Sequence, residues 1–309
     1  MAGIAFLGPP GTFTEEALLS EPDLAARELV ARGSIAEIFA AVERGEADAG
    51  VVPIENSIEG SISETLDTLA FSSELTIQRE IVRPVSLNLL VHAGTGLGDV
   101  RTVVSLPYAT AQCRGWLAAN LPGVEIVAAN STAGAAEQVA RSRRQGLAAI
   151  GTHLAAELYG LRVVVPDIED HPENATRFVV IGRGIPAPSG HDKTSVVCFQ
   201  HADRPGSLLA ILQEFAARAI NLTRLESRPT KTGLGRYCFV IDFEGHVADE
   251  LVADALRNLS AKQDRVKFLG SYPAASTEAG RARRDAAGKA WKQASGWVEE
   301  LRSQVRQEP

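Results

Sequence analysis

The sequence predicts an α/β protein with a larger unit over residues 1–182 and a smaller one over residues 193–272. In the larger unit, short apolar runs alternate with segments of helical period, which is typical of parallel strands joined by helices. In the smaller unit, the segments follow the order βαββαβ, which is the split-βαβ, ferredoxin-like arrangement. A chain of 309 residues exceeds one typical domain, so two or three folded units are expected.

Eight apolar runs predict the strands of the larger unit, with helices in the gaps between them. These runs cover residues 4–7, 49–52, 85–91, 100–104, 125–128, 148–150, 163–165 and 178–181. Ser34 with Glu37, and Ser61 with Glu64, have the spacing of a capping box, in which the serine and glutamate side chains bind backbone N–H groups at a helix start. We therefore expect a helix to begin after each serine.

A Gly- and Pro-rich stretch at residues 183–192 predicts a linker between the two units. After it, residues 194–201, 222–227, 235–243 and 266–272 are strand-like, and residues 205–219 and 247–261 are helix-like. The tail at residues 273–309 repeats apolar residues at spacings of three and four. It is either a helix that leans on the body or on a second subunit, or a partly disordered segment.

Composition limits the classes of function. The net charge of -7 and the pI near 5.5 argue against a nucleic-acid surface, so the ligand should be small. Cys113, Cys198 and Cys238 lie far apart without a C-x-x-C pair, which suggests neither a disulfide framework nor a metal site. A signal peptide and an apolar run of about 18 residues are both absent from the sequence, so we expect a cytoplasmic protein.

The polar run before the last apolar segment of the larger unit predicts a binding site. The triplet Thr176, Arg177 and Phe178, which follows Asn174, brings an alcohol, a guanidinium and an aromatic ring to the point where a loop enters a strand. Such groups suit a small anionic ring compound. If Thr-Arg-Phe is considered alone, the alternative to a binding site is that these residues only begin an ordinary strand.

A glycine-bearing turn follows the first predicted strand and opens a helix, so backbone N–H groups and the positive end of the helix predict an anion seat there. Thr12 and Thr14 lie in this turn, and each could instead be a simple helix cap. Further along, an apolar strand runs through a proline into Glu55, Asn56 and Ser57. The alternative interpretation makes Asn56 and Ser57 turn formers.

Hydroxyl side chains recur after two more predicted strands. Ser105 precedes a helix on which Gln112 lies two turns later, and Ser131 and Thr132 follow the next strand. Each serine alone could be only an N-cap. Together they matter because ligands of open α/β sheets bind beyond the carboxyl ends of the strands.

These motifs, in this order, resemble the prephenate dehydratase family with a C-terminal ACT regulatory domain. The segments that carry the resemblance over residues 4–182 are GTFTEEA, VPIENSIEGSI, S-x-P-x-A-x-A-Q-C, STA-x-AA and TRF. The smaller unit adds PGSLL at residues 205–209, NL at 221–222 and ESRP at 226–229. Two positions depart from the family pattern: Leu106 stands where the family often has histidine, and Ser207 stands in a loop that often reads G-A-L. Because Leu106 has no imidazole, a catalytic role for histidine cannot be placed at that position. Ser207 leaves open which amino acid is the effector.

The resemblance implies a two-lobed, periplasmic-binding-protein-like catalytic domain with crossings near residues 78–84 and 163–176, followed by the ACT domain. It implies loss of water and carbon dioxide from prephenate to give phenylpyruvate, without a cofactor. Thr176 would donate to the departing hydroxyl, with Glu55 as the nearest candidate proton source. Arg177 would hold a carboxylate, and Phe178 would close the apolar side against the ring.

The remaining expected contacts also follow from the resemblance. The other substrate-binding residues are Thr12, Asn56, Ser57, Ser105, Gln112, Ser131 and Thr132. The effector-binding residues are Gly206, Ser207, Leu208, Asn221, Leu222, Glu226, Ser227 and Arg228. The effector, phenylalanine in the family, would bind between paired ACT domains, so a homodimer or homotetramer is expected.

Three alternatives stay open from the sequence. Arogenate dehydratase differs only in the substrate, which has an amino group where prephenate has a keto group. A two-lobed sensor would bind an anionic metabolite through the same turns without chemistry. The ACT unit could also serve only as a dimer scaffold.

Overall fold

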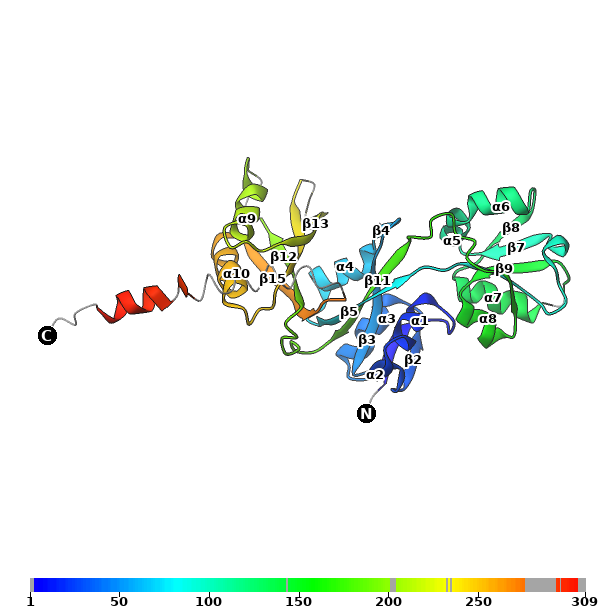
Figure 1. Cartoon of the computed structure of the whole chain (residues 1–309), viewed down its shortest axis with the longest axis horizontal. Coiled ribbons are helices and arrows are strands. Elements are labelled where there is room, and N and C mark those ends of the chain that lie inside the picture. Colours follow the sequence, from blue (N-terminus) through cyan, green and yellow to red (C-terminus); the bar gives the residue numbers. More distant parts are fainter. Residues whose placement is uncertain are drawn as a thin grey trace. The chain divides into compact units, whose positions relative to one another are not determined.

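The computed structural model describes residues 3–142, 144–200, 204–231, 233, 235–275, 293–294 and 296–304. The chain divides into two compact units, which Figure 1 draws in ribbon form. The first unit contains Met1–Ser73 and Ile81–Gly182, and the second contains Glu74–Glu80 and Arg183–Pro309. Among the described residues, no helix is long and apolar enough to cross a membrane.

The first sheet and its helices form lobe 1. The strand order is β2-β1-β3-β11-β5, with β4 paired to β3. β1 is parallel to β2 and β3, whereas β11 is antiparallel to β3. The strands are β1 (Ile4–Leu7), β2 (Leu29–Arg32), β3 (Ala49–Asn56), β4 (Gly60–Ser61), β5 (Thr76–Pro84) and β11 (Ala175–Gly182). The helices are α1 (Phe13–Leu19), α2 (Pro22–Ala25), α3 (Ile35–Glu43), α4 (Ser63–Asp67) and the π-helical turn η1 (Thr68–Ser72).

The second sheet and its helices form lobe 2, with the strand order β10-β6-β9-β7-β8. Strands β7, β8 and β9 are parallel, and β6 is antiparallel to both of its neighbours. The strands are β6 (Asn88–Val91), β7 (Thr102–Ser105), β8 (Glu125–Ala128), β9 (Leu147–Gly151) and β10 (Arg162–Val165). The helices are α5 (Pro107–Gln112), α6 (Arg114–Asn120), α7 (Thr132–Arg141), α8 (His153–Tyr159) and the 3₁₀ turn η2 (Leu97–Asp99).

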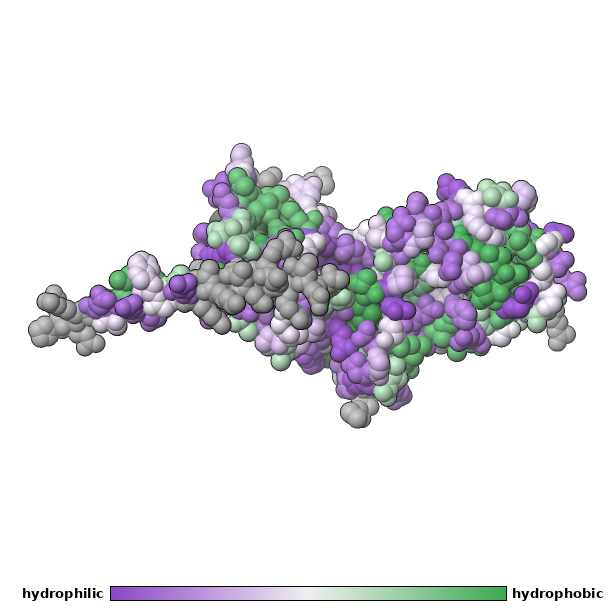
Figure 2. Space-filling model, in the orientation of Figure 1, coloured by the Kyte–Doolittle hydropathy of each residue, from purple (hydrophilic) through white to green (hydrophobic). Residues whose placement is uncertain are grey.

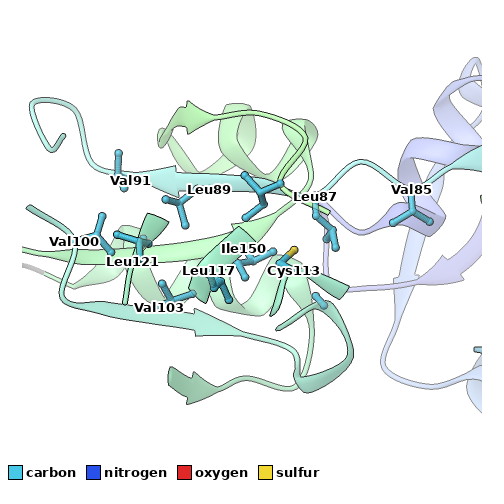
Figure 3. Close-up of a cluster of buried hydrophobic side chains, with 13 residues drawn as sticks. Val85, Leu87, Leu89, Val91, Val100, Val103, Cys113, Leu117, Leu121 and Ile150 are labelled. Carbon is cyan, nitrogen blue, oxygen red and sulfur yellow. The ribbon is translucent and has the colours of Figure 1, made fainter. Parts of the chain in front are cut away.

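Two segments connect the lobes, one leaving lobe 1 after β5 and one returning before β11 (Figure 1). They are joined by a backbone hydrogen bond from Val85 N to Asn174 O of 2.8 Å. The lobe 2 core begins directly at the first connection, because Val85 and Leu87 belong to the same buried cluster as Cys113 and Ile150 (Figure 3). The first connection is therefore held to lobe 2 by buried side chains as well as by the continuous backbone.

Of the two predicted capping boxes, the one at Ser34 forms by half, because Glu37 binds the N–H group of Gly33 instead of that of Ser34. Ser34 Oγ accepts from Glu37 N at 3.2 Å, and the Glu37 carboxylate accepts from Gly33 N at 2.9 Å, so α3 begins as expected. The box at Ser61 is wrong. Ser61 pairs with Glu55 across β3 and β4, and α4 begins only at Ser63 without a side-chain cap.

Several strand predictions needed correction. The predicted strand at 85–91 begins only at residue 88, and the sheets are mixed rather than wholly parallel. β2 and β5 were missed because their side chains are only partly buried or alternate with charged residues. β3 continues through Pro53 to Asn56, since the register shifts between the pairs Phe178–Pro53 and Arg177–Glu55. Such a bulge accommodates proline within a sheet.

The second unit contains an antiparallel sheet of order β13-β14-β12-β15. Helices α9 and α10 bury Ile211, Phe215 and Leu259 with Ile241 and Phe243 of the sheet. The elements are β12 (Asp192–Phe199), α9 (Ser207–Ala216), β13 (Leu222–Pro229), β14 (Tyr237–Glu244), α10 (Glu250–Lys262) and β15 (Arg265–Pro273). This order confirms the predicted βαββαβ arrangement.

Of the predicted tail, residues 293–294 and 296–303 are helical and exposed. The side chain of Trp297 is 62% exposed. Residues 276–292, 295 and 305–309 lie outside the described residues.

Candidate active site

The predicted triplet Thr176, Arg177 and Phe178 lies inside β11, which pairs with β3, the strand that carries the predicted acid and amide. The register places Thr176 opposite Asn56 and Arg177 opposite Glu55. Because successive side chains of a strand point to opposite faces, the two pairs lie on opposite faces of the lobe 1 sheet. The antiparallel pairing thus brings four predicted residues together but separates them into two groups.

Asn56 is the most highly connected side chain of the first group. Its Oδ1 accepts from the backbone N–H groups of Ile58 (2.9 Å) and Glu59 (3.0 Å). Its Nδ2 donates to Asn174 Oδ1 and to Thr176 Oγ1, both at 2.9 Å. The two backbone donors fix which end of the amide is oxygen, so the nitrogen necessarily faces Thr176.

Asn174 links this group to the other lobe. Its Oδ1 accepts from Asn56 Nδ2 and from Ser57 Oγ (3.1 Å), both in lobe 1. Its Nδ2 donates to Gln112 Oε1 of lobe 2 at 3.2 Å. Asn174 is 1% exposed, so its hydrogen bonds form in a site shielded from water. We call Asn56, Ser57, Gln112, Asn174 and Thr176 the amide network.

The Thr176 hydroxyl is the reactive group of the amide network. It accepts from Asn56 Nδ2, which occupies one lone pair of the oxygen. Within the described ranges, Thr176 Oγ1 donates no hydrogen bond, and the side chain is only half-buried. The hydroxyl can therefore donate to a bound ligand.

Arg177 and Glu55 form the second group, with 3.5 Å between Nη1 and Oε2. The arginine side chain is 11% exposed and the glutamate side chain 37%. Since this pair faces away from Thr176, the register does not favour a proton transfer from Glu55 to the Thr176 hydroxyl. Both side chains lie one residue from the amide network along their strands.

Phe178 lies in the core of lobe 1. It is 2% exposed and packs in one cluster with Phe6, Leu18 and Val180. This gives its ring a packing role beneath β11, and a contact with a ligand ring stays a prediction.

The turn before α1 differs from an open anion seat. The Glu15 carboxylate accepts from Gly11 N, so a side chain of the same helix occupies this N–H group. Thr12 Oγ1 donates to Leu7 O at 2.8 Å and does not cap α1. Thr12 is 8% exposed, so it offers little surface to a ligand.

The remaining predicted residues lie in lobe 2. Ser105 is fully buried, and its Oγ donates to Leu106 O at 3.1 Å. Ser131 Oγ accepts from Gly134 N at 2.8 Å, so Ser131 is the N-cap of α7, and Thr132 follows it at 6% exposure. A surface hollow of about 430 Å³ includes Ser105 in its lining, together with Thr110, Arg114 and Ile126. Within the described ranges, neither Ser105 nor Ser131 forms a side-chain hydrogen bond with the amide network.

The lobes also meet at α8, through Thr152 and Leu154, which the sequence did not single out. Thr152 Oγ1 donates to Gly11 O at 2.7 Å, and Leu154 N donates to Glu16 Oε1 at 3.2 Å. Gly11 has a φ of +91°, and a Cβ there would lie 3.0 Å from Ala155 Cα, so only glycine fits this approach. Burial raises the pKa of Glu16, and the hydrogen bond from Leu154 opposes that rise.

The cysteines give no sign of a reactive centre. Cys113, Cys198 and Cys238 are free and buried. Burial raises the pKa of Cys113 and of Cys198 to about 12, which keeps both thiols protonated near neutral pH. Their role is packing.

In the second unit, the predicted effector residues fall into separate groups. Gly206 with a φ of 84° caps α9, and Ser207 Oγ donates to Arg204 O at 2.8 Å. Asn221 follows the far end of α9, which spans about 15 Å for its 10 residues. On β13, Glu226 lies between Arg224 and Arg228, and Arg228 Nη1 is 2.8 Å from Glu226 Oε1. Leu208 and Leu222 pack against the helix-side core, and Ser227 pairs with Phe239.

Comparisons with known proteins agree with this architecture. The family model of prephenate dehydratase matches residues 4–185, and that of the ACT domain matches residues 194–261. A prephenate dehydratase of Mycolicibacterium vanbaalenii is 48% identical over 288 residues, which cover 88% of this chain and 91% of that protein. A crystal structure of prephenate dehydratase from Arthrobacter aurescens in complex with L-Phe is 39% identical, with a TM-score of 0.87. The match covers 97% of this chain and 99% of that chain.

A further solved structure has a different description. GqqA, described as a novel type of quorum quenching acylase, is 32% identical with a TM-score of 0.77. The match covers 88% of this chain and 98% of that chain. The shared fold therefore accompanies more than one described activity.

Proposed function

The chain belongs to the prephenate dehydratase family, and we propose that the amide network around Thr176 is where it acts on its substrate. The enzyme is a hydro-lyase that converts prephenate into phenylpyruvate, water and carbon dioxide in phenylalanine biosynthesis. The single observation that supports this location best is the Asn56–Thr176 hydrogen bond of 2.9 Å. This bond occupies one lone pair of a half-buried hydroxyl, which can still donate its hydrogen to a ligand.

The chemistry sets what this location must supply. In the reaction the carbon–carbon bond to the ring carboxylate breaks, its electron pair completes the aromatic ring, and the ring carbon–oxygen bond breaks. The departing hydroxyl takes up one proton and leaves as water, so the prephenate dianion and one proton give the phenylpyruvate anion, carbon dioxide and water. A donor at the departing oxygen is therefore the main requirement. General acid assistance of this kind contributes about 10² to 10⁴ in rate.

Thr176 is proposed as that donor. An alcohol is a weak acid, so its role is to polarise the departing hydroxyl and to relay a proton. The amide of Asn56 supports this role because it donates to Thr176 Oγ1 and cannot accept from it. Glu55 stays a predicted proton source, although the register places it with Arg177 on the other face.

Arg177 stays the proposed anchor of a substrate carboxylate. Its guanidinium can form two parallel bonds to a carboxylate, and Glu55 Oε2 lies 3.5 Å from Arg177 Nη1. Ser57 and Gln112 are proposed to contact the substrate from the two sides of the lobe junction. Both carry polar groups that bind Asn174 in the structure.

The acylase description of one similar structure finds no support in this site. An acyl-transfer nucleophile needs an adjacent base that removes its proton. The hydroxyls of Ser57 and Thr176 are instead bound by amide groups, through Asn174 Oδ1 and Asn56 Nδ2. The geometry favours hydrogen-bond donation rather than nucleophilic attack.

The second unit is a regulatory ACT domain, and phenylalanine is its proposed effector. One similar structure was solved in complex with L-Phe. We take the catalytic domain as residues 1–182, the linker as 183–192 and the ACT domain as 193–272.

A homodimer or homotetramer is the proposed assembly. Ser207 and Asn221 lie at opposite ends of α9, so one chain does not bring these effector residues together. Paired ACT domains would supply them from two chains. The unit exposes Leu209 (58%), Leu225 (43%) and Tyr237 (45%), and Figure 2 shows hydrophobic surface beside α9. Light scattering after size exclusion tests this, and a monomer at micromolar concentration would contradict it.

The three free, buried cysteines support a reducing compartment, so we place the protein in the cytoplasm.

The proposed function is tested by the initial rate of phenylpyruvate formation from prephenate, with arogenate as the competing substrate. We expect turnover of prephenate with the higher kcat/KM. Binding of prephenate without formation of phenylpyruvate would instead identify a sensor.

A further inference from the structure

We propose that Asn174 is a positioning residue that sets the direction of the Thr176 hydroxyl through Asn56. This inference rests on the proposed function of the amide network. Asn174 was not among the residues expected to bind substrate. Three observations support its role: its place in the chain, its hydrogen bonds and its burial.

Asn174 lies in the second connection between the lobes, directly before β11. Its backbone O accepts from Val85 N of the first connection at 2.8 Å, and its backbone N donates to His171 O at 3.1 Å. The main chain at residue 174 is therefore held at the point where both connections meet. The Asn174 side chain is 1% exposed, so it has little room to move, and its orientation is set by its hydrogen-bond partners.

The Asn174 side chain forms hydrogen bonds with both lobes. Oδ1 accepts from Asn56 and Ser57 of lobe 1, and Nδ2 donates to Gln112 of lobe 2 at 3.2 Å. Gln112 is itself fixed because its backbone O accepts from Asp170 N at 2.7 Å. The orientation of the Asn174 amide thus depends on groups from both lobes.

The effect on Thr176 passes through Asn56. The Asn56 amide is fixed at Oδ1 by two backbone N–H groups, and at Nδ2 by Asn174 Oδ1. With one Nδ2 hydrogen held by Asn174, the other is directed to Thr176 Oγ1. Nδ2 also donates to Ala175 O at 3.3 Å, the longest of its three hydrogen bonds, and without Asn174 Oδ1 the amide can turn further towards that oxygen. The Thr176 hydroxyl then loses the bond that directs its hydrogen to the substrate.

The test compares Asn174→Ala with a matched control in the same protein. Asn88 is also buried (2% exposed), also lies at the edge of a connection, and its Nδ2 donates to Gly151 O at 3.3 Å. Asn88→Ala should lose a similar amount of thermal stability. We expect Asn174→Ala to lower kcat for prephenate about 10²-fold with KM changed less than about threefold, because small misplacement of a catalytic group costs about this much. Asn88→Ala should keep kcat within about twofold of wild type.

A double-mutant cycle with Thr176→Ala separates positioning from general packing. If Asn174 acts through the Thr176 hydroxyl, then Asn174→Ala should lower kcat less than about threefold further in the Thr176→Ala background. A full additional 10²-fold loss in that background, or a kcat of Asn174→Ala equal to that of Asn88→Ala, would overturn the proposal.

Failure of the proposed function has a different signature. In that case wild type would not turn over prephenate, or Thr176→Ala would turn over like wild type. If wild type is active and Thr176→Ala is impaired while Asn174→Ala retains its kcat, only the role of Asn174 is refuted.

Discussion

Replacement of Thr176 by alanine removes the donor that the proposed mechanism needs, and the structure indicates how large the loss should be. The hydroxyl accepts one hydrogen bond, from Asn56 Nδ2 at 2.9 Å, and has one hydrogen to give. Loss of general acid assistance costs about 10² to 10⁴ in kcat. At about 1.36 kcal/mol per tenfold, this corresponds to about 2.7 to 5.4 kcal/mol of transition-state stabilisation.

The same change should leave the fold intact. Asn56 Nδ2 retains Asn174 Oδ1 at 2.9 Å, so the cost to folding is one net hydrogen bond, about 1 kcal/mol. This corresponds to a melting temperature about 2 to 4 °C lower. The assay is the kcat of phenylpyruvate formation from saturating prephenate, with Thr176→Ser as the control that keeps the hydroxyl. Serine should stay within about tenfold of wild type, and an alanine variant within about threefold of wild type would refute the reasoning.

Three other predictions concern different parts of the molecule. Arg177→Lys should raise KM for prephenate about 10-fold or more with a smaller change in kcat, because lysine cannot form two parallel bonds to a carboxylate; unchanged KM in steady-state kinetics would remove the anchor role. Burial raises the pKa of Glu16, so its contribution to stability is present below the ordinary value of 4.5 and is lost as pH rises through the folded pKa. Glu16→Gln should therefore gain melting temperature relative to wild type as pH rises, and a difference independent of pH would contradict this. Because the pKa of Cys113 and of Cys198 is about 12, iodoacetamide should modify them about 10² times more slowly in the native than in the urea-unfolded protein. Mass spectrometry after timed labelling checks this, and equal rates would show that these thiols are accessible.

The sequence predicted the architecture where hydrophobic pattern determines it. The run at residues 4–7 is β1 without change, and the βαββαβ order of the second unit is confirmed. β5 could not be predicted, because in TIQREIVRP charged residues interrupt the apolar ones. Its strand conformation comes from pairing with β11, which local pattern does not report.

The site was predictable by residue type but not by geometry. Thr176 and Asn56 are 120 residues apart, and only the antiparallel register of β3 and β11 shows that they touch. The same register places Glu55 opposite Arg177, on the other face of the sheet from Thr176. The alternation of side chains along each strand does not show this unless it is known that β3 and β11 are paired. Asn174 stood next to the predicted triplet, but its link to Gln112 depends on how the two lobes meet.

The most direct test of the central claim is a crystal structure of the slow Thr176→Ala variant soaked with prephenate. The proposed site predicts that the ring hydroxyl of prephenate lies within about 4 Å of Asn56 Nδ2 and of the alanine side chain. Prephenate bound instead in the lobe 2 hollow lined by Thr110, Arg114 and Ile126, away from Asn56, would contradict it.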